Sequence, residues 1–516
     1  MEKKRSIAKS SILIATLVCA GKILGFIKQS VIAWGFGASN ATDLFFAADG
    51  FTSTIANVLC MSIAPSILTA YLLIRNEKGE KEADTLVGRG MLFFSAVGVV
   101  LIIINSVFSK QIADIIGISY TPDQKSLLGI YVIVLSASIL FASTGGVLQG
   151  YLNANSNYAP GRLAGLFYSV FMILGVFLFK DTLGVNSLIL GFLTGYALHT
   201  VFLMIYARKV VRIPFGNPFR DSDFRRMLRN FVPLLISLSI VDFGHLIDKI
   251  IASSLEEGSV SVLNYGQVIS SDLVNAVVIT TVGTVLLTSF TDSVSKGEDR
   301  ESVASSVRDI LGSLGLIVVL ITVLYYVEGH DLIEVVLQRG SFDAASTSRV
   351  HEVAFFYSLG FFFMAVREIL VKVHYAYQDM KSPVYNSCAG VVINLVLSIV
   401  LSKTMGVSGI ALATSISLLA VSVLSVLTLR KHIGRSVFDK TISLDILKII
   451  GSGLVAAIAG SMIRDLITGL PHVIRMIMTG ISISVIYICS VLILREKAAT
   501  GFVKSGVALI RKNRKG

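Results

Sequence analysis

The feature that most constrains this chain is a succession of apolar runs, each about 20 residues or longer, separated by short polar loops. A continuous run of this length fits an α-helix that spans a bilayer, because a helix satisfies its own backbone hydrogen bonds in lipid. Strands of a membrane barrel would instead alternate apolar and polar residues. The runs therefore predict an all-α integral membrane protein.

The composition agrees with this interpretation. Of 516 residues, 54% are hydrophobic and only 15% are charged, whereas soluble domains carry about 25% charged residues. A water-soluble enzyme is therefore excluded, and the chain is expected to form one large membrane unit. The four cysteines, Cys19, Cys60, Cys388 and Cys489, lie within apolar runs and form no C-x-x-C pair, so we expect neither a disulfide framework nor a metal site.

We expect about fourteen transmembrane helices from the apolar runs. The predicted spans cover residues 10–36, 43–74, 86–108, 126–150, 160–180, 186–207, 229–254, 262–291, 309–327, 348–377, 383–402, 407–429, 444–468 and 473–494. The first span follows a basic segment, as a signal peptide would. It is too long for that role and other spans follow at once, so we expect no cleavage.

Basic residues gather in alternate loops, which predicts the orientation. They crowd the loops after the second, sixth and twelfth spans and the C-terminal tail, whereas residues 36–43 and 254–262 contain none. By the positive-inside rule, both termini are expected in the cytoplasm. The same distribution explains the net charge of +12 without a nucleic-acid partner, since no continuous basic face is predicted.

An internal repeat is visible at a spacing of roughly 220 residues, a signal typical of transporters built from two related halves. Ile32-Ala33 recurs as Ile251-Ala252, and Lys78-Gly79-Glu80 recurs as Lys296-Gly297-Glu298. We therefore predict two six-helix lobes and two additional C-terminal helices. The expected divisions are an N-terminal lobe (1–208), a cytoplasmic linker (209–228), a C-terminal lobe (229–430), and spans 13 and 14 with a basic tail (431–516).

Charged side chains within the predicted spans are the candidate functional residues, because charge inside a bilayer is costly and tends to be functional. The cations Lys22, Lys28 and Arg367 would suit an anionic substrate such as a phosphate, and Asp43 begins the second span. Arg367 and Glu368 are neighbours on a helix and are expected to point apart. We predict substrate binding by Lys22, Lys28, Arg367 and Asp43, and coupling or gating by Asp242, Asp248 and Asp272.

Four ordered motifs resemble the MurJ/MviN family of lipid II flippases, within the multidrug/oligosaccharidyl-lipid/polysaccharide exporter superfamily. They are "GKILGFIKQSVIAWGFGASNATDLFFAADG" (21–50), "LIDKIIASSLEEGSVSVLNYG" (246–266), "VLQRGSFDAASTSRV" (336–350) and "YAYQDMKSPV" (375–384). The resemblance implies a fourteen-helix fold, a central cavity and alternating access. It also implies a multi-pass protein of the bacterial cytoplasmic membrane, acting on a lipid-linked anionic oligosaccharide for cell-wall synthesis.

The sequence departs from the family pattern at several cations. Lysines at 22 and 28 replace the two arginines that the family usually carries in its first span. Ala56 and Val268 stand where two further arginines are expected. An exopolysaccharide or O-antigen-type repeat unit on a polyprenyl pyrophosphate therefore remains an open alternative to a lipid II-like precursor.

The sequence disfavours two further classes of function. A cation-coupled drug antiporter of the same fold should have an acidic or aromatic cavity, which the lysines of the first span disfavour. A membrane glycosyltransferase needs a carboxylate base, usually with a long extramembrane loop, and His351-Glu352 does not continue into H-E-x-x-H because position 355 is Phe. We predict a monomeric, non-enzymatic flippase without cofactor, in contact with membrane lipids and driven by a proton, sodium or the membrane potential.

Overall fold

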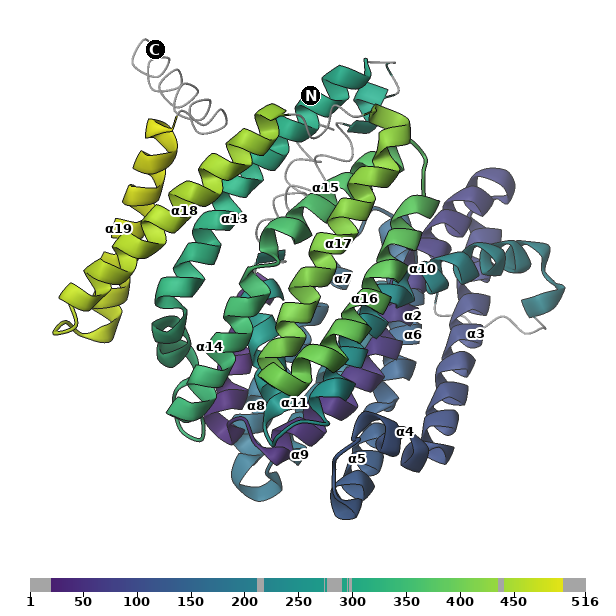
Figure 1. Ribbon diagram of the computed structural model, residues 1–516. Helices are drawn as coiled ribbons and strands as arrows, with labels where there is room; N and C mark the ends of the chain where they lie inside the picture. The colour runs from purple at the N-terminus through teal and green to yellow at the C-terminus, as the bar shows by residue number, and fades with distance from the viewer. Residues whose placement is uncertain are drawn as a thin grey trace, which may run out of the picture. The chain divides into compact units, whose positions relative to one another are not determined.

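The computed structural model describes residues 20–210, 218–272, 274–275, 290–294, 296, 299–434 and 440–494. Every regular element within these residues is a helix (Figure 1). Eleven helices of this part are long and apolar enough to cross a membrane, and one bent helix pair adds a twelfth. The predicted all-α membrane fold is thus confirmed. The predicted spans 10–36 and 262–291 extend outside the described residues, so the count of fourteen stays a prediction.

The described chain forms two compact units, Met1–Asn264 with Arg339–Phe342, and Tyr265–Gln338 with Asp343–Gly516. The first unit contains a helix over residues 20–36 and then α2 (Asn40–Lys78), α3 (Glu80–Val107), α4 (Ser109–Ile116), α5 (Pro122–Leu135), α6 (Ala137–Ala154), α7 (Ala159–Arg162), α8 (Ala164–Leu183), α9 (Asn186–Tyr206), the short 3-10 helix η1 (Pro218–Arg220) and α10 (Ser222–Ala252). The border between the units falls inside α11 (Ser259–Gln267).

The second unit begins with the end of α11 and a π-helical turn, η2 (Val268–Asp272). It continues with α13 (Arg300–Leu337), α14 (Ala344–Ser358), α15 (Phe361–Ala376), α16 (Lys381–Met405), α17 (Val407–Ile433), α18 (Lys440–Leu466) and α19 (His472–Ile493). The short segment Arg339–Phe342 packs with the first unit, where the Ser341 amide donates to the Trp34 carbonyl at 3.0 Å.

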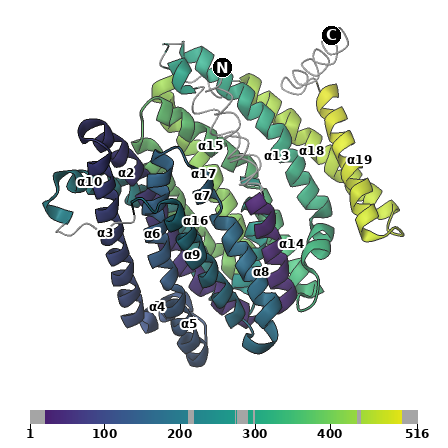
Figure 2. The same cartoon turned by 180° about the vertical axis from the view of Figure 1, so that it is seen from behind.

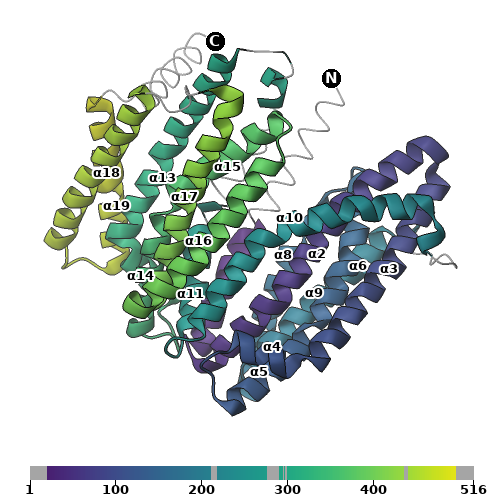
Figure 3. The same ribbon diagram turned by 45° about the vertical axis from the view of Figure 1, so that its right-hand side comes forward.

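Glycines let α2 and α6 approach closely within the first unit (Figure 3). A Cβ at Gly150 would lie 2.6 Å from the Ala64 carbonyl oxygen, and one at Gly146 would lie 3.2 Å from Cβ of Ile63. The four-residue spacing of the two glycines places both on one face of α6, as in small-residue contacts between membrane helices. The sequence "GGVLQG" therefore positions α2, which carries Asp43 and Asp49.

Ion pairs tie the turn between α2 and α3 to the beginning of α10. Lys78 pairs with Asp223 at 2.6 Å, Arg89 pairs with Asp221, and Arg226 lies 3.6 Å from Glu77. This end of the first unit carries the basic loops that the positive-inside rule assigns to the cytoplasm.

In the second unit, α18 and α19 form a hairpin that packs along α13 (Figures 1 and 2). Their shared core contains Val323, Val327, Ile449, Ala456, Ala457, Ile483, Tyr487 and Val491. Small residues such as Ala456 lie where the helices meet, while exposed apolar side chains such as Leu454 and Ile458 point away from this core. Such outward apolar surface is expected for helices that face lipid.

One predicted span is bent in the structure. Helices α14 and α15 meet at 41° across Leu359 and Gly360. A Cβ at Gly360 would lie 2.7 Å from Oγ of Ser415 on α17. The glycine therefore allows the bend to pack directly against α17. The bend begins α15, the helix that carries Arg367.

Candidate functional site

The two lysines of the first span lie on the helix over residues 20–36. Lys22 is exposed and Lys28 is half-buried, next to the buried Gln29. Within the described residues, no atom outside the local helix lies within 4 Å of a Cβ built at Gly21. Their six-residue separation turns the two side chains toward different sectors of the helix. The structure thus leaves Lys22 accessible and places Lys28 partly inside the first unit.

Asp43 is enclosed at the start of α2, where it is 2% exposed. Its carboxylate accepts hydrogen bonds from the amides of Gly258 (2.7 Å) and Ser261 (2.8 Å) and from the Ser261 hydroxyl (2.6 Å). These bonds join the first turn of α2 to the beginning of α11. A carboxylate with this set of donors orders the surrounding backbone.

The acids of α10 differ in their surroundings. Asp242 is half-buried and Asp248 is 2% exposed. Lys249 follows directly and lies across α2, since its Nζ is 3.2 Å from the position of a Cβ at Gly50. Asp49, the neighbour of Gly50, accepts from the Ser53 hydroxyl at 2.6 Å. Sequence reasoning placed these charges in the membrane but did not predict that Gly50 provides the space for a lysine.

Arg367 pairs with Glu368 at 2.6 Å, which corrects the expectation that the two side chains point apart. Both side chains are about a quarter exposed (23% and 25%) and long enough to bend toward each other along α15. Glu368 also lies 3.9 Å from Lys372, four residues later. The arginine keeps a buried Nε without a hydrogen-bond partner, so it retains capacity to donate to another acceptor.

Asp272 ends the π-helical turn Val268–Asp272 and is half-buried. The Tyr325 hydroxyl of α13 donates to the carbonyl of Ile269 in that turn. A π-helical turn frees backbone groups from the usual ladder and often marks a functional position. Sequence reasoning had predicted a regular helix here, and no sequence pattern signals a π turn.

A second charged cluster escaped the sequence analysis. Asp331 of α13 is 1% exposed and accepts from Arg464 of α18 at 2.7 Å and from Arg475 of α19 at 2.7 Å. Glu328, one turn earlier, is 5% exposed. The predicted ninth span ends at residue 327, which leaves both acids outside it. Their spacing of three residues on a helix that continues to Leu337 was the available signal.

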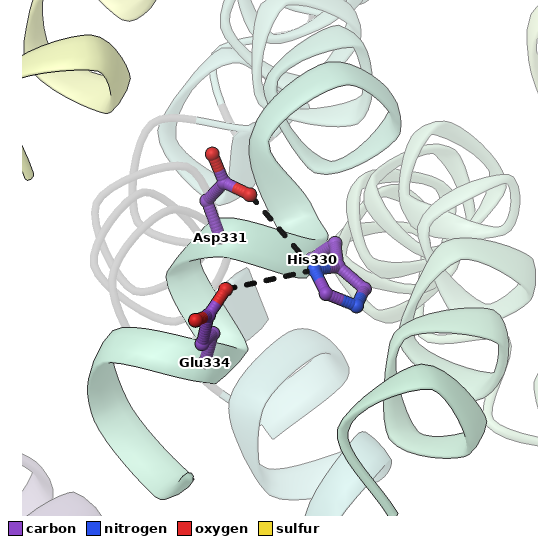
Figure 4. Close-up of side chains that lie close together, drawn as sticks. All are labelled: His330, Asp331 and Glu334. Carbon is purple, nitrogen blue, oxygen red and sulfur yellow. Dashed lines mark ion pairs between the residues drawn. The ribbon is translucent and has the colours of Figure 1, made fainter. Parts of the chain in front are cut away.

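His330, Asp331 and Glu334 have donor atoms within 4.8 Å of one another, as a metal site would (Figure 4). The His330 Nδ1 lies 3.8 Å from Asp331 and 4.0 Å from Glu334. However, both oxygens of Asp331 already accept bonds from guanidinium groups, and two nearby positive charges oppose a metal ion. The cluster therefore has the chemistry of an ion-pair network.

Long apolar helices with charged side chains half-buried among them define a polytopic membrane transporter. A family model described as lipid II flippase MurJ matches residues 32–486. The chain belongs to this family.

Relatives of similar length agree with the family match. A probable lipid II flippase MurJ of Thermotoga maritima is 24% identical over 483 residues, covering 90% of this chain and 93% of the relative. One of Rickettsia prowazekii is 24% identical over 419 residues, covering 79% and 81%.

Solved structures show the same fold. Lipid II flippase MurJ in an inward closed conformation matches with a TM-score of 0.78 and 21% identity, covering 92% of this chain and 98% of that one. An inward-facing multidrug resistance MATE family transporter of the MOP superfamily matches with a TM-score of 0.65 and 14% identity, covering 82% and 98%. The fold is therefore common to flippases and drug transporters. The family match, and not the fold, separates this chain from the drug transporters.

Proposed function

We propose that this protein is a flippase that moves a lipid II-like precursor, a glycan on a polyprenyl pyrophosphate, across the membrane by alternating access. The family match over residues 32–486 carries this proposal. The relatives named probable lipid II flippases support it, because the alignments cover most of both chains. The protein performs transport and changes no covalent bond of its substrate.

The proposed binding cations have the chemistry that a pyrophosphate requires. Lys22 and Lys28 offer point charges, and Arg367 offers a planar guanidinium with an unused Nε. Charge-assisted hydrogen bonds of this kind favour phosphate oxygens. Asp43 orders the backbone around the first unit's helices, and Asp242, Asp248 and Asp272 are the proposed coupling or gating acids.

The cellular setting follows from the same proposal. The protein acts in the bacterial cytoplasmic membrane as a monomer, with both termini in the cytoplasm and membrane lipids around it. A proton, a sodium ion or the membrane potential drives the movement, because the potential acts on charge carried across the bilayer.

The test is flipping of a labelled lipid II analogue in proteoliposomes by the double variant Lys22→Ala/Lys28→Ala. We expect transport to fall at least about tenfold, since losing two charge-assisted contacts costs more than about 1.4 kcal/mol. The matched control is Lys110→Ala/Lys403→Ala, which removes two exposed lysines near helix ends. Equal transport by both double variants would show that Lys22 and Lys28 do not contribute to substrate binding.

A second candidate substrate is another polyprenyl-pyrophosphate glycan, such as an exopolysaccharide or O-antigen-type repeat unit. Ala56 favours it, because this residue stands where the family has an arginine and is completely buried. An arginine that would contact part of the substrate is thus missing at position 56, and the buried alanine leaves no exposed side chain there. Native mass spectrometry of lipids that copurify with the protein distinguishes the two glycans by mass.

A further inference from the structure

Glu328 is a buried carboxyl group that the proposed transport site does not use. It lies on α13, nine residues before Leu337 and therefore about 14 Å from the end of the helix. The side chain is 5% exposed, and neither carboxyl oxygen has a hydrogen-bond partner. The hydroxyl of Thr479 on α19 is a neighbouring donor to this carboxyl, but the two groups do not reach hydrogen-bond geometry.

The arginines near Glu328 bond to other acceptors. Arg464 donates to the Asp331 carboxylate at 2.7 Å and to the Val327 carbonyl at 3.0 Å. Arg475 donates twice to the other oxygen of Asp331, at 3.1 and 2.7 Å. Asp331 is thus fully ion-paired, whereas Glu328 is left without a cation in contact.

Within the described residues, the charged groups near Glu328 come from α13, α18 and α19. Arg464 comes from α18 and Arg475 from α19, while Asp331 belongs to α13 itself. His351 of α14 lies against the neighbouring Gly329, with its Cδ2 2.9 Å from the position of a Cβ. Helix α15 meets α13 nearer the other end, where Phe362 contacts Gly315.

An ionised carboxylate in this position would be buried without a hydrogen bond or a contacting counter-ion, and such a group normally takes up a proton instead. We propose that Glu328 is a proton-binding site that is occupied in this conformation. Its proton exchanges with water at the turn between α18 and α19, past His330 and His472, which are 36% and 54% exposed.

Release of the proton has a defined consequence for the hairpin. The carboxylate becomes an acceptor one turn from Asp331, and Arg464 leaves the Val327 carbonyl to pair with it. Asp331 keeps Arg475, so each acid then has one arginine. Proton binding at Glu328 is thereby linked to the contacts that Arg464 of α18 makes with α13. This link does not depend on which lipid the protein moves.

The test is infrared spectroscopy of the full-length protein in nanodiscs, titrated with alkali. We expect a protonated-carboxyl band in the wild type at neutral pH that disappears as the pH rises and is absent in Glu328→Gln. The control is Glu334→Gln, which removes a half-buried acid of the same helix that pairs with His472 at 3.3 Å. This control should keep the band.

Thermal unfolding of the same samples provides a second readout. Glu328→Gln mimics the protonated acid and should melt as the wild type does at low pH, but should not lose stability as the pH rises. If Glu328→Gln does not fold, Glu328→Asp should shift the band in frequency. A wild type without a titrating band, or a band that Glu328→Gln retains, would overturn the proposal.

Discussion

At the scale of single residues, Asp43 illustrates how a charge in an apolar segment can organise the backbone. Its carboxylate accepts three hydrogen bonds from Gly258 and Ser261 in a site that is closed to solvent. An amide at this position can accept only through one atom, and its NH2 group would face an N–H donor. A carboxylate therefore satisfies these three donors in a way that an amide cannot.

We expect Asp43→Asn to lower the stability of the protein by about 1 to 3 kcal/mol, the usual cost of leaving buried donors unpaired. Thermal unfolding in detergent measures this loss. Asp181→Asn, at an exposed position near the end of α8, is the matched control and should melt with the wild type. Unfolding of Asp43→Asn at the wild-type temperature would contradict the structural role.

Asp379 predicts a pH dependence outside the membrane-spanning segments, in the turn between α15 and α16. Burial alone would raise the pKa of the Asp379 carboxyl, but hydrogen bonds from Lys431, Ser382 and His432 outweigh it and hold the pKa far below its usual value. Because the folded pKa is depressed, the stabilisation is present above the unfolded value of about 3.9 and is lost as the pH falls below it.

We therefore expect Asp379→Asn to be less stable than the wild type at pH 7, with the difference shrinking below about pH 4. Melting curves of both proteins across this range provide the measurement. A difference that stays constant from pH 7 to about pH 3 would show that the ion pairs of Asp379 contribute nothing to the pH dependence.

At the scale of elements, the contact between α2 and α6 depends on the absence of side chains. At Gly150, a Cβ would lie 2.6 Å from the Ala64 carbonyl oxygen and 2.7 Å from Cβ of Ile67. Neither neighbour is the end of a flexible side chain, so the helices must separate to accept an alanine. We expect Gly150→Ala to lose about 1 to 3 kcal/mol, as overpacked cores do.

The control for Gly150→Ala is Gly451→Ala. Gly451 is also in a helix, but no atom lies within 4 Å of its added Cβ. That substitution should leave the melting temperature unchanged or raise it, because alanine favours the helix over glycine. Equal destabilisation by the two substitutions would show that helix propensity causes the effect and that close packing at Gly150 does not.

The sequence predicts elements well where hydrophobicity alone decides them. The runs at 186–207 and 383–402 correspond to α9 and α16 within a few residues, because a membrane span needs a fixed apolar length. The prediction ends early at α13, since Glu328, Asp331 and Glu334 interrupt the apolar run while the helix continues to Leu337. Hydropathy cannot detect that Arg464 and Arg475, over 100 residues away in the sequence, neutralise one of these acids.

Site residues are predicted less completely, because a charge in a span can serve several purposes. Lys22, Lys28 and Arg367 remain candidates for binding, and their roles stay predictions. The buried hydrogen bonds of Asp43 and the ion pair of Arg367 with Glu368 depend on side-chain geometry. The spacing of residues along the sequence does not specify that geometry. The sequence could not predict that Glu328 lacks a hydrogen-bond partner, because this depends on which acceptors the arginines bond to in the folded protein.

At the scale of the whole molecule, the distribution of charge predicts how the chain sits in the membrane. Arg225 is exposed near the start of α10, beside the ion pairs that join this helix to α2 and α3. Lys403 is exposed in the last turn of α16, next to a loop that the predicted topology assigns to the opposite side. The predicted orientation therefore places the two positions on opposite faces of the bilayer.

We expect opposite labelling of Arg225→Cys and Lys403→Cys by a membrane-impermeant maleimide in intact bacterial cells, after the four native cysteines are replaced by serine. The cysteine at position 403 should react in intact cells, and that at position 225 only after permeabilisation. The cysteine-free protein controls for background. Labelling of position 225 in intact cells would invert the predicted orientation of the chain in the membrane.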